Sequence, residues 1–282
     1  MLSVSFSMAT MAMPGNEMVT SQHVQSSDVA YFPTSLPKKA VTLVVHGLNV
    51  KPTAMLGLIE WFNQQGSDAY LISLMGHTEK GGKIGDVTAE QWEKNMLDGY
   101  DVANKASRES SSPLYFIGYS VGALLGQDMI QLAERKIHFE KQILIAPSTA
   151  IRSRSHVLKL LFFLSQKKTL PSYTPEAYRA NERLPLKVYK IMFKKEKALY
   201  SSRFTKVNIP TLILIDPKDE LISYRKLKRL KKKFSLTNHE IVTLDSDLKA
   251  RGGEYHHLII NEATMGVQNW KMVTARLKDF LF

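Results

Sequence analysis

The 282-residue sequence contains no cysteine. This absence excludes a disulfide framework, a Cys-ligated zinc or iron–sulfur centre, a cysteine nucleophile and a thiol-linked lipid anchor. A membrane-spanning helix needs an uninterrupted apolar run of about 18 residues, and the sequence has none. Hydrophobic residues make up 44% of the chain and charged residues 23%, which is the balance of a globular protein rather than of a disordered chain, a collagen or a coiled coil.

The N-terminal stretch contains no Lys or Arg, since the first basic residue of the sequence is Lys38. A secretory signal carries positive charge in front of its apolar stretch. We therefore expect a cytoplasmic protein, with export through an atypical or truncated signal as the alternative. Residues 1–37 are predicted to form a poorly ordered N-terminal tail.

The formal net charge of +12 is distributed unevenly along the chain. Residues 151–206 hold fourteen Lys or Arg and three Asp or Glu, whereas the rest of the chain is nearly balanced. We find no helix-turn-helix signature, zinc finger or aromatic RNP box, so nucleic acid is not an expected partner. A second basic run, residues 225–233, has apolar residues at helical spacing and is predicted to be an amphipathic helix with a solvated basic face.

Short apolar runs alternate with segments of helical periodicity along most of the chain. Strands are expected at 40–46, 69–74, 114–119, 142–146, 211–215 and 240–244, with helices between and after them. This alternation predicts an α/β fold with a mostly parallel, doubly wound sheet, in which ligands bind beyond the carboxyl ends of the strands. The alternation breaks once, so residues 151–206 are predicted to form a basic helical cap over those ends, and 38–150 with 207–282 to form the core.

One motif carries nucleophile chemistry. Gly118-Tyr119-Ser120-Val121-Gly122 has the G-x-S-x-G spacing and lies between a predicted strand and a predicted helix. Such a nucleophile elbow holds its serine on a strained turn, and the two glycines allow the strand and helix to approach closely. The helix N-terminus beyond the turn favours negative charge near Ser120.

A serine nucleophile needs a base, and the base needs an acid that orients it. In this architecture the chain order is serine, acid, histidine. Asp216 and Asp219 follow the predicted strand at 211–215, and His256 and His257 follow the last strand, whereas His239 precedes it and lies at the wrong end. The pattern leaves both acids and both histidines open.

Acyl transfer also needs hydrogen-bond donors for the oxyanion. The backbone N–H of Val121, directly after the serine, is expected to be one donor. The loop after the first core strand is expected to supply the other through the N–H of Leu48. We interpret His46 as a residue that braces this loop rather than as the base, because the base comes last in the chain.

These motifs resemble those of the α/β-hydrolases, in particular the carboxylesterase, monoacylglycerol lipase and lysophospholipase branch. The resemblance runs from about residue 41 to the C-terminus and rests on the segments VTLVVHGLN, LMGH, FIGYSVGA, ILIAPS, LIDPKDELIS and YHHLIIN. It implies an α/β-hydrolase fold with a cap inserted after the sixth family strand. It also implies Ser120 as nucleophile, Asp219 as acid and His257 as base. Asp216 and His256 occupy positions where the family usually has glycine, so both stay as alternates.

The resemblance implies a serine ester hydrolase that cleaves acyl esters, with monoacylglycerols and lysophospholipids as candidate substrates. The alternatives are a peptidase or thioesterase with the same triad, or a non-catalytic binding protein on a hydrolase scaffold. No cofactor and no metal are expected, because the sequence has no Walker loop, no GxGxxG after a strand and no HExxH. The oligomeric state is left open.

Apolar clusters lie within the basic segment at 158–164, 188–193 and 200–204. Apolar clusters surrounded by Lys and Arg suit an interfacial surface. One hypothesis is that the cap accepts an acyl chain and rests on an anionic membrane. The alternative is that these clusters pack onto the sheet and the charge keeps the surface soluble.

Overall fold

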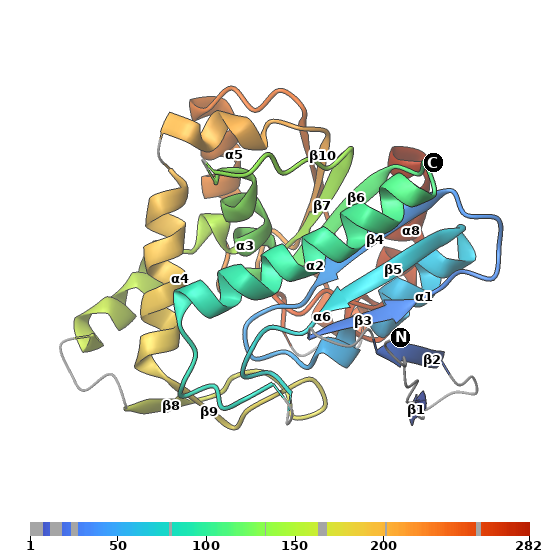
Figure 1. Ribbon diagram of the computed structural model, residues 1–282. Coiled ribbons are helices and arrows are strands. Elements are labelled where there is room, and N and C mark those ends of the chain that lie inside the picture. The colour runs from blue at the N-terminus through green and yellow to red at the C-terminus, as the bar shows by residue number, and fades with distance from the viewer. Residues whose placement is uncertain are drawn as a thin grey trace.

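A computed structural model describes residues 8–11, 19–23, 28–78, 81–132, 134–162, 168–200, 202–251 and 255–282. Its central sheet has the strand order β1-β2-β3-β5-β4-β6-β7-β10-β11 in this part of the chain. The strands from β5 to β11 in that order are parallel, whereas β3, β2 and β1 are added antiparallel at one edge. The predicted mostly parallel α/β sheet is confirmed (Figure 1).

The sheet is built from β1 (Met8–Met11), β2 (Val19–His23), β3 (Val29–Phe32), β4 (Ala40–Val45), β5 (Ser67–Ile72), β6 (Leu114–Tyr119), β7 (Lys141–Ile145), β10 (Thr211–Ile215) and β11 (His239–Thr243). The helices outside the cap are η1 (Pro52–Met55), α1 (Leu56–Gln64), α2 (Ala89–Glu109), α3 (Val121–Ile130), α5 (Tyr224–Lys233), α6 (Leu248–Arg251), α7 (Glu262–Met265) and α8 (Val267–Leu281). In Figure 1, α2 crosses in front of the sheet, while α1 and α8 lie behind it. Strands β4, β5, β6 and β10 are buried along their whole length, as expected for strands covered on both faces.

Local sequence signals account for several helices. Thr88 and Gln91 form the capping box at the start of α2, each accepting a hydrogen bond from the other's backbone N–H. The apolar side of α2 buries Trp92, Met96 and Tyr100. Helix α5 has the predicted amphipathic character, with Leu227 buried beneath the basic face. Among the helices that the structure describes, none combines the length and apolar character needed to cross a bilayer.

Two elements differ from the sequence-based predictions. Residues 29–32 were expected in a poorly ordered tail, but they form β3, which buries Val29 and Phe32 and pairs with β5. The tail prediction is therefore wrong for this segment, whereas residues 1–7, 12–18 and 24–27 lie outside the described residues. The sequence pattern predicts one last helix over roughly 262–281, but the structure divides it into α7 and α8, because Gly266 has a φ of 78° and interrupts the helix.

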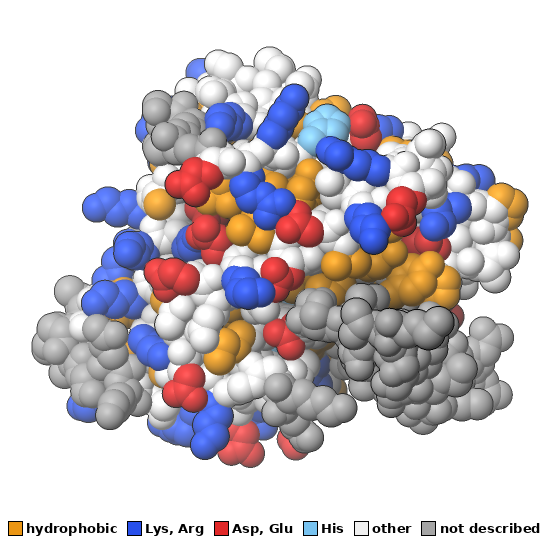
Figure 2. All heavy atoms as spheres, in the orientation of Figure 1, with side chains coloured by type: hydrophobic (Ala, Val, Ile, Leu, Met, Phe, Trp, Pro, Cys, Tyr) orange, Lys and Arg blue, Asp and Glu red, His pale blue; other side chains and the backbone are white. Residues whose placement is uncertain are grey.

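The segment between β7 and β10 holds more than helices. It contains η2 (Ser148–Ala150), η3 (Ser153–Leu161), the antiparallel pair β8 (Thr169–Pro171) and β9 (Arg183–Pro185), α4 (Leu186–Leu199) and η4 (Ser202–Val207). Lys195 of α4 anchors this cap to the core through Glu93 at 3.0 Å and Asp128 at 2.5 Å. Figure 2 shows Lys and Arg side chains gathered along the left edge of the molecule, the side on which Figure 1 places α4.

The cap's apolar clusters separate into two groups. Val188, Phe193 and Phe204 are buried in the hydrophobic core, which favours the packing interpretation for the second and third clusters. Leu158 and Phe162 of the first cluster are only partly buried against that core. An acyl-binding surface on the cap would therefore be formed by the first cluster, at 158–164.

The start of α3 lies directly against the ends of β4 and β6. A Cβ atom on Gly122 would stand 2.6 Å from the carbonyl oxygen of Val45 and 2.5 Å from that of His46. A Cβ on Gly118 would stand 2.5 Å from the backbone of Ala123. Backbone atoms cannot move aside as a flexible side chain can, so both positions require glycine.

Gly122→Ala should lower the free energy of unfolding by about 1–3 kcal/mol, because the added methyl group overpacks the contact between α3 and β4. The measurement is chemical denaturation at equilibrium. Gly85→Ala is the matched control, since a Cβ there meets no atom within 4 Å. Equal stability of the two variants would contradict the close approach of α3 to β4.

Candidate active site

Ser120 occupies the turn between β6 and α3. Its backbone has φ 51° and ψ −111°, a region that a residue with a side chain rarely adopts, so the strained turn expected of a nucleophile elbow is observed. The N–H of Ser120 donates to the carbonyl oxygen of Ile145 on β7 at 2.8 Å. The residue is 6% exposed. The close helix and this hydrogen bond together hold Ser120 in the strained conformation.

Asp219 lies in the loop after β10 and is completely buried. Its Oδ1 accepts hydrogen bonds from the N–H groups of Leu221 and Ile222 at 2.7 and 2.8 Å. These bonds compensate the burial of the carboxylate and set its direction. Its second oxygen, Oδ2, is left to face the histidine loop.

His257 connects Asp219 with Ser120. Its Nδ1 lies 2.8 Å from Asp219 Oδ2, and its Nε2 lies 3.0 Å from Ser120 Oγ. With Asp219 as acceptor, the neutral imidazole carries its proton on Nδ1, and Nε2 can accept the hydroxyl proton of Ser120. Tyr119 contacts His257 in two ways. Its ring centroid lies 5.4 Å from that of the imidazole, and its hydroxyl donates a hydrogen bond to the His257 carbonyl oxygen.

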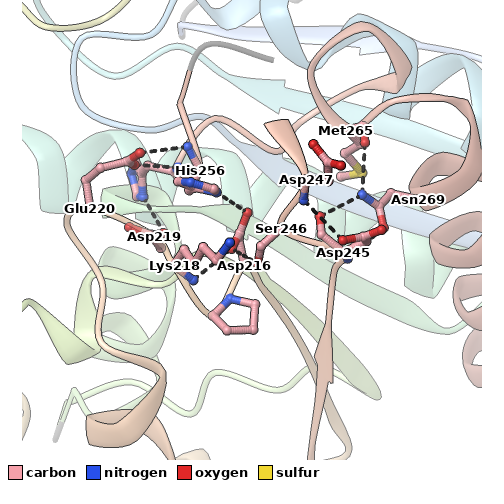
Figure 3. A network of polar contacts seen from close by, with 12 residues as sticks. Asp216, Lys218, Asp219, Glu220, Asp245, Ser246, Asp247, His256, Met265 and Asn269 are labelled. Carbon is pink, nitrogen blue, oxygen red and sulfur yellow. Dashed lines mark hydrogen bonds and ion pairs between the residues drawn. The ribbon is translucent and has the colours of Figure 1, made fainter. Parts of the chain in front are cut away.

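His256 and Asp216 form a second histidine–carboxylate pair (Figure 3). His256 Nδ1 lies 2.7 Å from Oδ2 of the fully buried Asp216. Ser246 Oγ and the N–H of Lys218 donate to the other oxygen of Asp216. His256 also lines a surface hollow of about 410 Å³ together with Lys218 and Lys249. His256 and Asp216 are the alternates that the sequence left open. Among the hydrogen bonds of the described residues, those that reach Ser120 Oγ come from His257 and Ser148, not from this pair.

Glu220 holds both histidines by their backbone and was not singled out in the sequence. One carboxylate oxygen accepts the N–H of His256 and the other accepts the N–H of His257, each at 2.9 Å. Figure 3 shows Glu220 on the same loop as Asp216 and Asp219, with its carboxylate facing His256. Sequence spacing contains no signal for this contact, since 36 residues separate Glu220 from His256.

The cap's first residues hold the acid loop from the other side. Arg152 Nε donates to the carbonyl oxygen of Asp219 at 2.6 Å, and Arg154 donates to that of Glu220 at 2.9 Å. An isolated bridge joins Ile151 to Ile222. The position of the acid therefore depends on the cap as well as on β10.

The predicted oxyanion loop lies against the elbow. A Cβ on Gly47 would stand 3.1 Å from Ser120 Cβ, which places the loop after β4 in contact with the serine. Among the hydrogen bonds of the described residues, neither Leu48 N–H nor Val121 N–H donates to a protein acceptor. Both amides are thus free to bind an oxyanion, and that role stays a prediction.

Two buried histidines brace this loop. His46 Nε2 accepts the N–H of Leu74 at 3.0 Å, and its Nδ1 lies 2.8 Å from the Gly47 carbonyl oxygen. His77 Nε2 accepts the N–H of Asn49 at 2.8 Å. The two rings are 4.7 Å apart between centroids. His46 therefore has the bracing contacts expected of it, whereas the sequence did not single out the contribution of His77.

Burial keeps both rings neutral. Desolvation lowers the pKa of His46 well below its ordinary range, and the neighbouring His77 adds to the effect. Desolvation lowers the pKa of His77 to about 4, although its hydrogen bonds to the Met75 and Leu74 carbonyl oxygens oppose the shift. An acceptor Nε2 on each ring requires this neutral form.

Asn49 joins the same loop to the cap. Its side-chain amide donates to Ser172 Oγ and to the Asn181 carbonyl oxygen, and its Oδ1 accepts the N–H of Asn181. The N–H of Ala180 donates to the Asn49 carbonyl oxygen at 3.0 Å. Asn49 has a φ of 58°, a conformation that asparagine tolerates better than most residues. The cap hairpin region therefore lies over the carboxyl ends of the strands, where the serine lies.

Within the described ranges, no three His, Asp or Glu side chains gather closely enough to hold a metal ion.

The fold and this arrangement are those of the α/β-hydrolase class. A family model described as serine aminopeptidase, S33, matches residues 37–191, more than half of the chain. The protein therefore belongs to this family of α/β-hydrolases. The matched range includes Ser120 and ends before Asp219 and His257.

Solved structures of similar fold include three esterases and lipases. A soluble variant of monoglyceride lipase from Saccharomyces cerevisiae is 10% identical with a TM-score of 0.74, over 99% of this chain and 95% of that chain. Monoacylglycerol lipase from Paleococcus ferrophilus is 19% identical with a TM-score of 0.66, over 89% and 98%. A carboxyl esterase from Bacillus coagulans is 12% identical with a TM-score of 0.65, over 99% and 100%. A search of curated proteins found no match.

The stability of the protein should fall as the pH is lowered from about 7 to about 5. The unfolded chain protonates His77 near its ordinary pKa of 6.5, whereas the folded protein resists protonation until about pH 4. The contribution of the neutral ring is complete above the unfolded value and is lost as pH falls toward the folded value, by roughly 2 kcal/mol at about pH 5.

Denaturant unfolding at a series of pH values measures this dependence. His77→Gln should make the pH dependence shallower by the His77 contribution, whereas His46 and His239, whose pKa values burial also lowers, keep the rest of it. His138→Gln at an exposed position serves as the control. A His77→Gln protein that keeps the full pH dependence would show that protonation of His77 does not contribute to the loss of stability at low pH.

Proposed function

We propose that the protein is a serine ester hydrolase, of the carboxylesterase or lipase type, that cleaves acyl esters through an acyl-enzyme. The observation that carries this proposal is the continuous chain of contacts from Asp219 Oδ2 through the His257 ring to Ser120 Oγ, at 2.8 and 3.0 Å. A general base within hydrogen-bond reach of a serine on a strained elbow is the arrangement that nucleophilic acyl transfer needs.

The reaction proceeds in two halves. Ser120 Oγ attacks the ester carbonyl carbon while its proton passes to His257 Nε2, and Asp219 stabilises the imidazolium that forms. The amides of Leu48 and Val121 stabilise the oxyanion, and His257 then protonates the departing alcohol. Water repeats these steps on the acyl-enzyme and releases the carboxylic acid.

The family description names an aminopeptidase, so a peptide substrate is the second candidate. An aminopeptidase has to hold a cationic amino terminus, and a carboxylate is the natural partner for it. In the described part of the chain, the buried carboxylates around the serine are already engaged: Asp219 with His257, Asp216 with His256, and Glu196 with Lys226 at 2.6 Å. This favours an uncharged acyl ester over a free amino terminus.

The test is a series of p-nitrophenyl esters from acetate to palmitate beside aminoacyl p-nitroanilides, with Ser120→Ala as the blank. We expect ester turnover and labelling by a fluorophosphonate probe in the native protein, and loss of both in Ser120→Ala. Faster release from the anilides would favour the peptidase. Thioester substrates in the same series test the thioesterase alternative, and an inactive, unlabelled native protein would leave the binding-scaffold alternative.

The adjacent histidines provide a matched pair of variants. His257→Ala should lower kcat by orders of magnitude, because its ring contacts Ser120 Oγ, whereas His256→Ala should lower it far less. Steady-state kinetics on the preferred ester measures both. The reverse order of effects would assign the base to His256.

We also propose that the protein rests on an anionic membrane surface, which would bring it to lipid esters. Arg225, Lys228, Arg229 and Lys232 form one stripe on α5 and line a hollow of about 620 Å³. Among the described residues, none of the four has an acidic partner. Leu221, just before this helix and two residues after Asp219, is 48% exposed. Basic side chains beside an exposed apolar residue suit an anionic interface.

Vesicle sedimentation tests the membrane proposal. Binding to phosphatidylcholine vesicles should require added phosphatidylserine and weaken with salt, since each basic side chain near the surface contributes about 1 kcal/mol. Replacing the four α5 cations by Gln should abolish this binding. The control makes the same charge change at exposed positions elsewhere, Lys39, Lys83, Lys271 and Lys278. Binding that ignores both phosphatidylserine and salt would overturn the proposal.

A further inference from the structure

Ser148 places a second hydroxyl beside the nucleophile. Its Oγ lies 3.1 Å from Ser120 Oγ, and its own N–H donates to the Ser120 carbonyl oxygen at 3.0 Å. The residue is 3% exposed and begins η2, three residues after Ile145, which ends β7 and accepts the Ser120 N–H. Ala146, two residues earlier, has a φ of 43°, which turns the chain so that Ser148 comes back to the elbow.

The proton arrangement of the site determines which serine donates. Asp219 accepts the Nδ1 proton of His257, so His257 Nε2 presents only a lone pair. Ser120 must therefore donate its proton to His257 at 3.0 Å, and its oxygen has lone pairs alone to offer to Ser148. The contact between the two serines is consequently a hydrogen bond from Ser148 O–H to Ser120 Oγ.

The Ser148 hydroxyl is committed to this contact. In the part of the chain that the structure describes, its oxygen has no hydrogen-bonding partner other than Ser120 Oγ. A buried hydroxyl loses its hydrogen bonds to water, a cost that alanine at the same place would not incur. The hydroxyl thus compensates its burial through the nucleophile alone.

We propose that Ser148 is a further catalytic residue, a hydrogen-bond donor to the nucleophilic oxygen itself; this rests on the proposed function. In the first half-reaction the Oγ–H bond of Ser120 breaks, the proton moves to His257 Nε2, and the Oγ–carbon bond forms. Negative charge builds on Oγ while its proton leaves, and Ser148 O–H stabilises that charge. Ser148 keeps its own proton throughout.

The same donor acts when the acyl-enzyme is hydrolysed. The carbon–Oγ bond breaks, its electron pair returns to Ser120 Oγ, and His257 returns the proton to that oxygen. Ser148 O–H stabilises Oγ as the leaving group in this step. Its target differs from that of the Leu48 and Val121 amides, which face the carbonyl oxygen of the substrate, so its loss should slow every reaction at Oγ.

The test compares Ser148→Ala with Ser148→Thr in the full-length protein. Because hydrogen bonds to charged groups are stronger than neutral ones, we expect kcat for a p-nitrophenyl ester to fall roughly tenfold to a hundredfold in Ser148→Ala. KM should change little, and the rate of fluorophosphonate labelling should fall in parallel. Ser148→Thr keeps the hydroxyl and should recover most of both rates.

Thr149→Val is the matched control, since it removes the next hydroxyl in the same short helix and leaves Ser148 in place. Thermal unfolding checks each variant, and Ser148→Cys, a weak donor of similar size, replaces Ser148→Ala if the latter does not fold. Native-like kcat and labelling in the hydroxyl-free variant would overturn the role of Ser148. An inactive and unlabelled native protein would instead overturn the proposed function beneath it.

Discussion

A contact made of backbone alone sets the geometry of this protein: the first turn of α3 lies against the ends of β4 and β6. Gly122 faces the carbonyl oxygens of Val45 and His46 with no room for a Cβ atom. The helix can therefore begin directly after Ser120, and the serine takes a positive φ. That conformation presents its hydroxyl at the carboxyl edge of the sheet, where loops from distant parts of the sequence meet it.

One loop of seven residues, 216–222, organises the acid and base side of the site. Its three acidic side chains have separate contacts: Asp219 orients His257, Asp216 holds His256, and Glu220 holds the backbone of both histidines. Each carboxylate faces hydrogen-bond donors, which compensates for placing three acidic groups close together. Arg152 of the cap donates a hydrogen bond to the carbonyl oxygen of Asp219 in the same loop, so the position of Asp219 depends on the cap.

Hydrophobic periodicity predicted most of the core sheet, and it failed where tertiary contacts decide the structure. β3 is too short to stand out from an apolar, serine-rich N-terminal stretch, and it is a strand because β5 offers an edge to pair with. The β8–β9 pair within the cap is equally short and is held over the loop after β4 by Asn49 and its partners. The sequence shows a glycine at position 266, but it does not predict the positive φ that ends α7 there, because that φ depends on how α7 and α8 pack.

The sequence by itself determined the strand–helix alternation, the elbow around Ser120 and the chain order of serine, acid and histidine, because these are local or sequential patterns. It did not distinguish Asp219 from Asp216 or His257 from His256 by pattern alone, and it did not reveal Ser148 or Glu220. Those choices depend on which atoms meet across 28 to 137 residues of chain. Only the packing of the loops against the sheet brings those atoms within hydrogen-bond distance, since adjacent residues on an extended loop point in different directions.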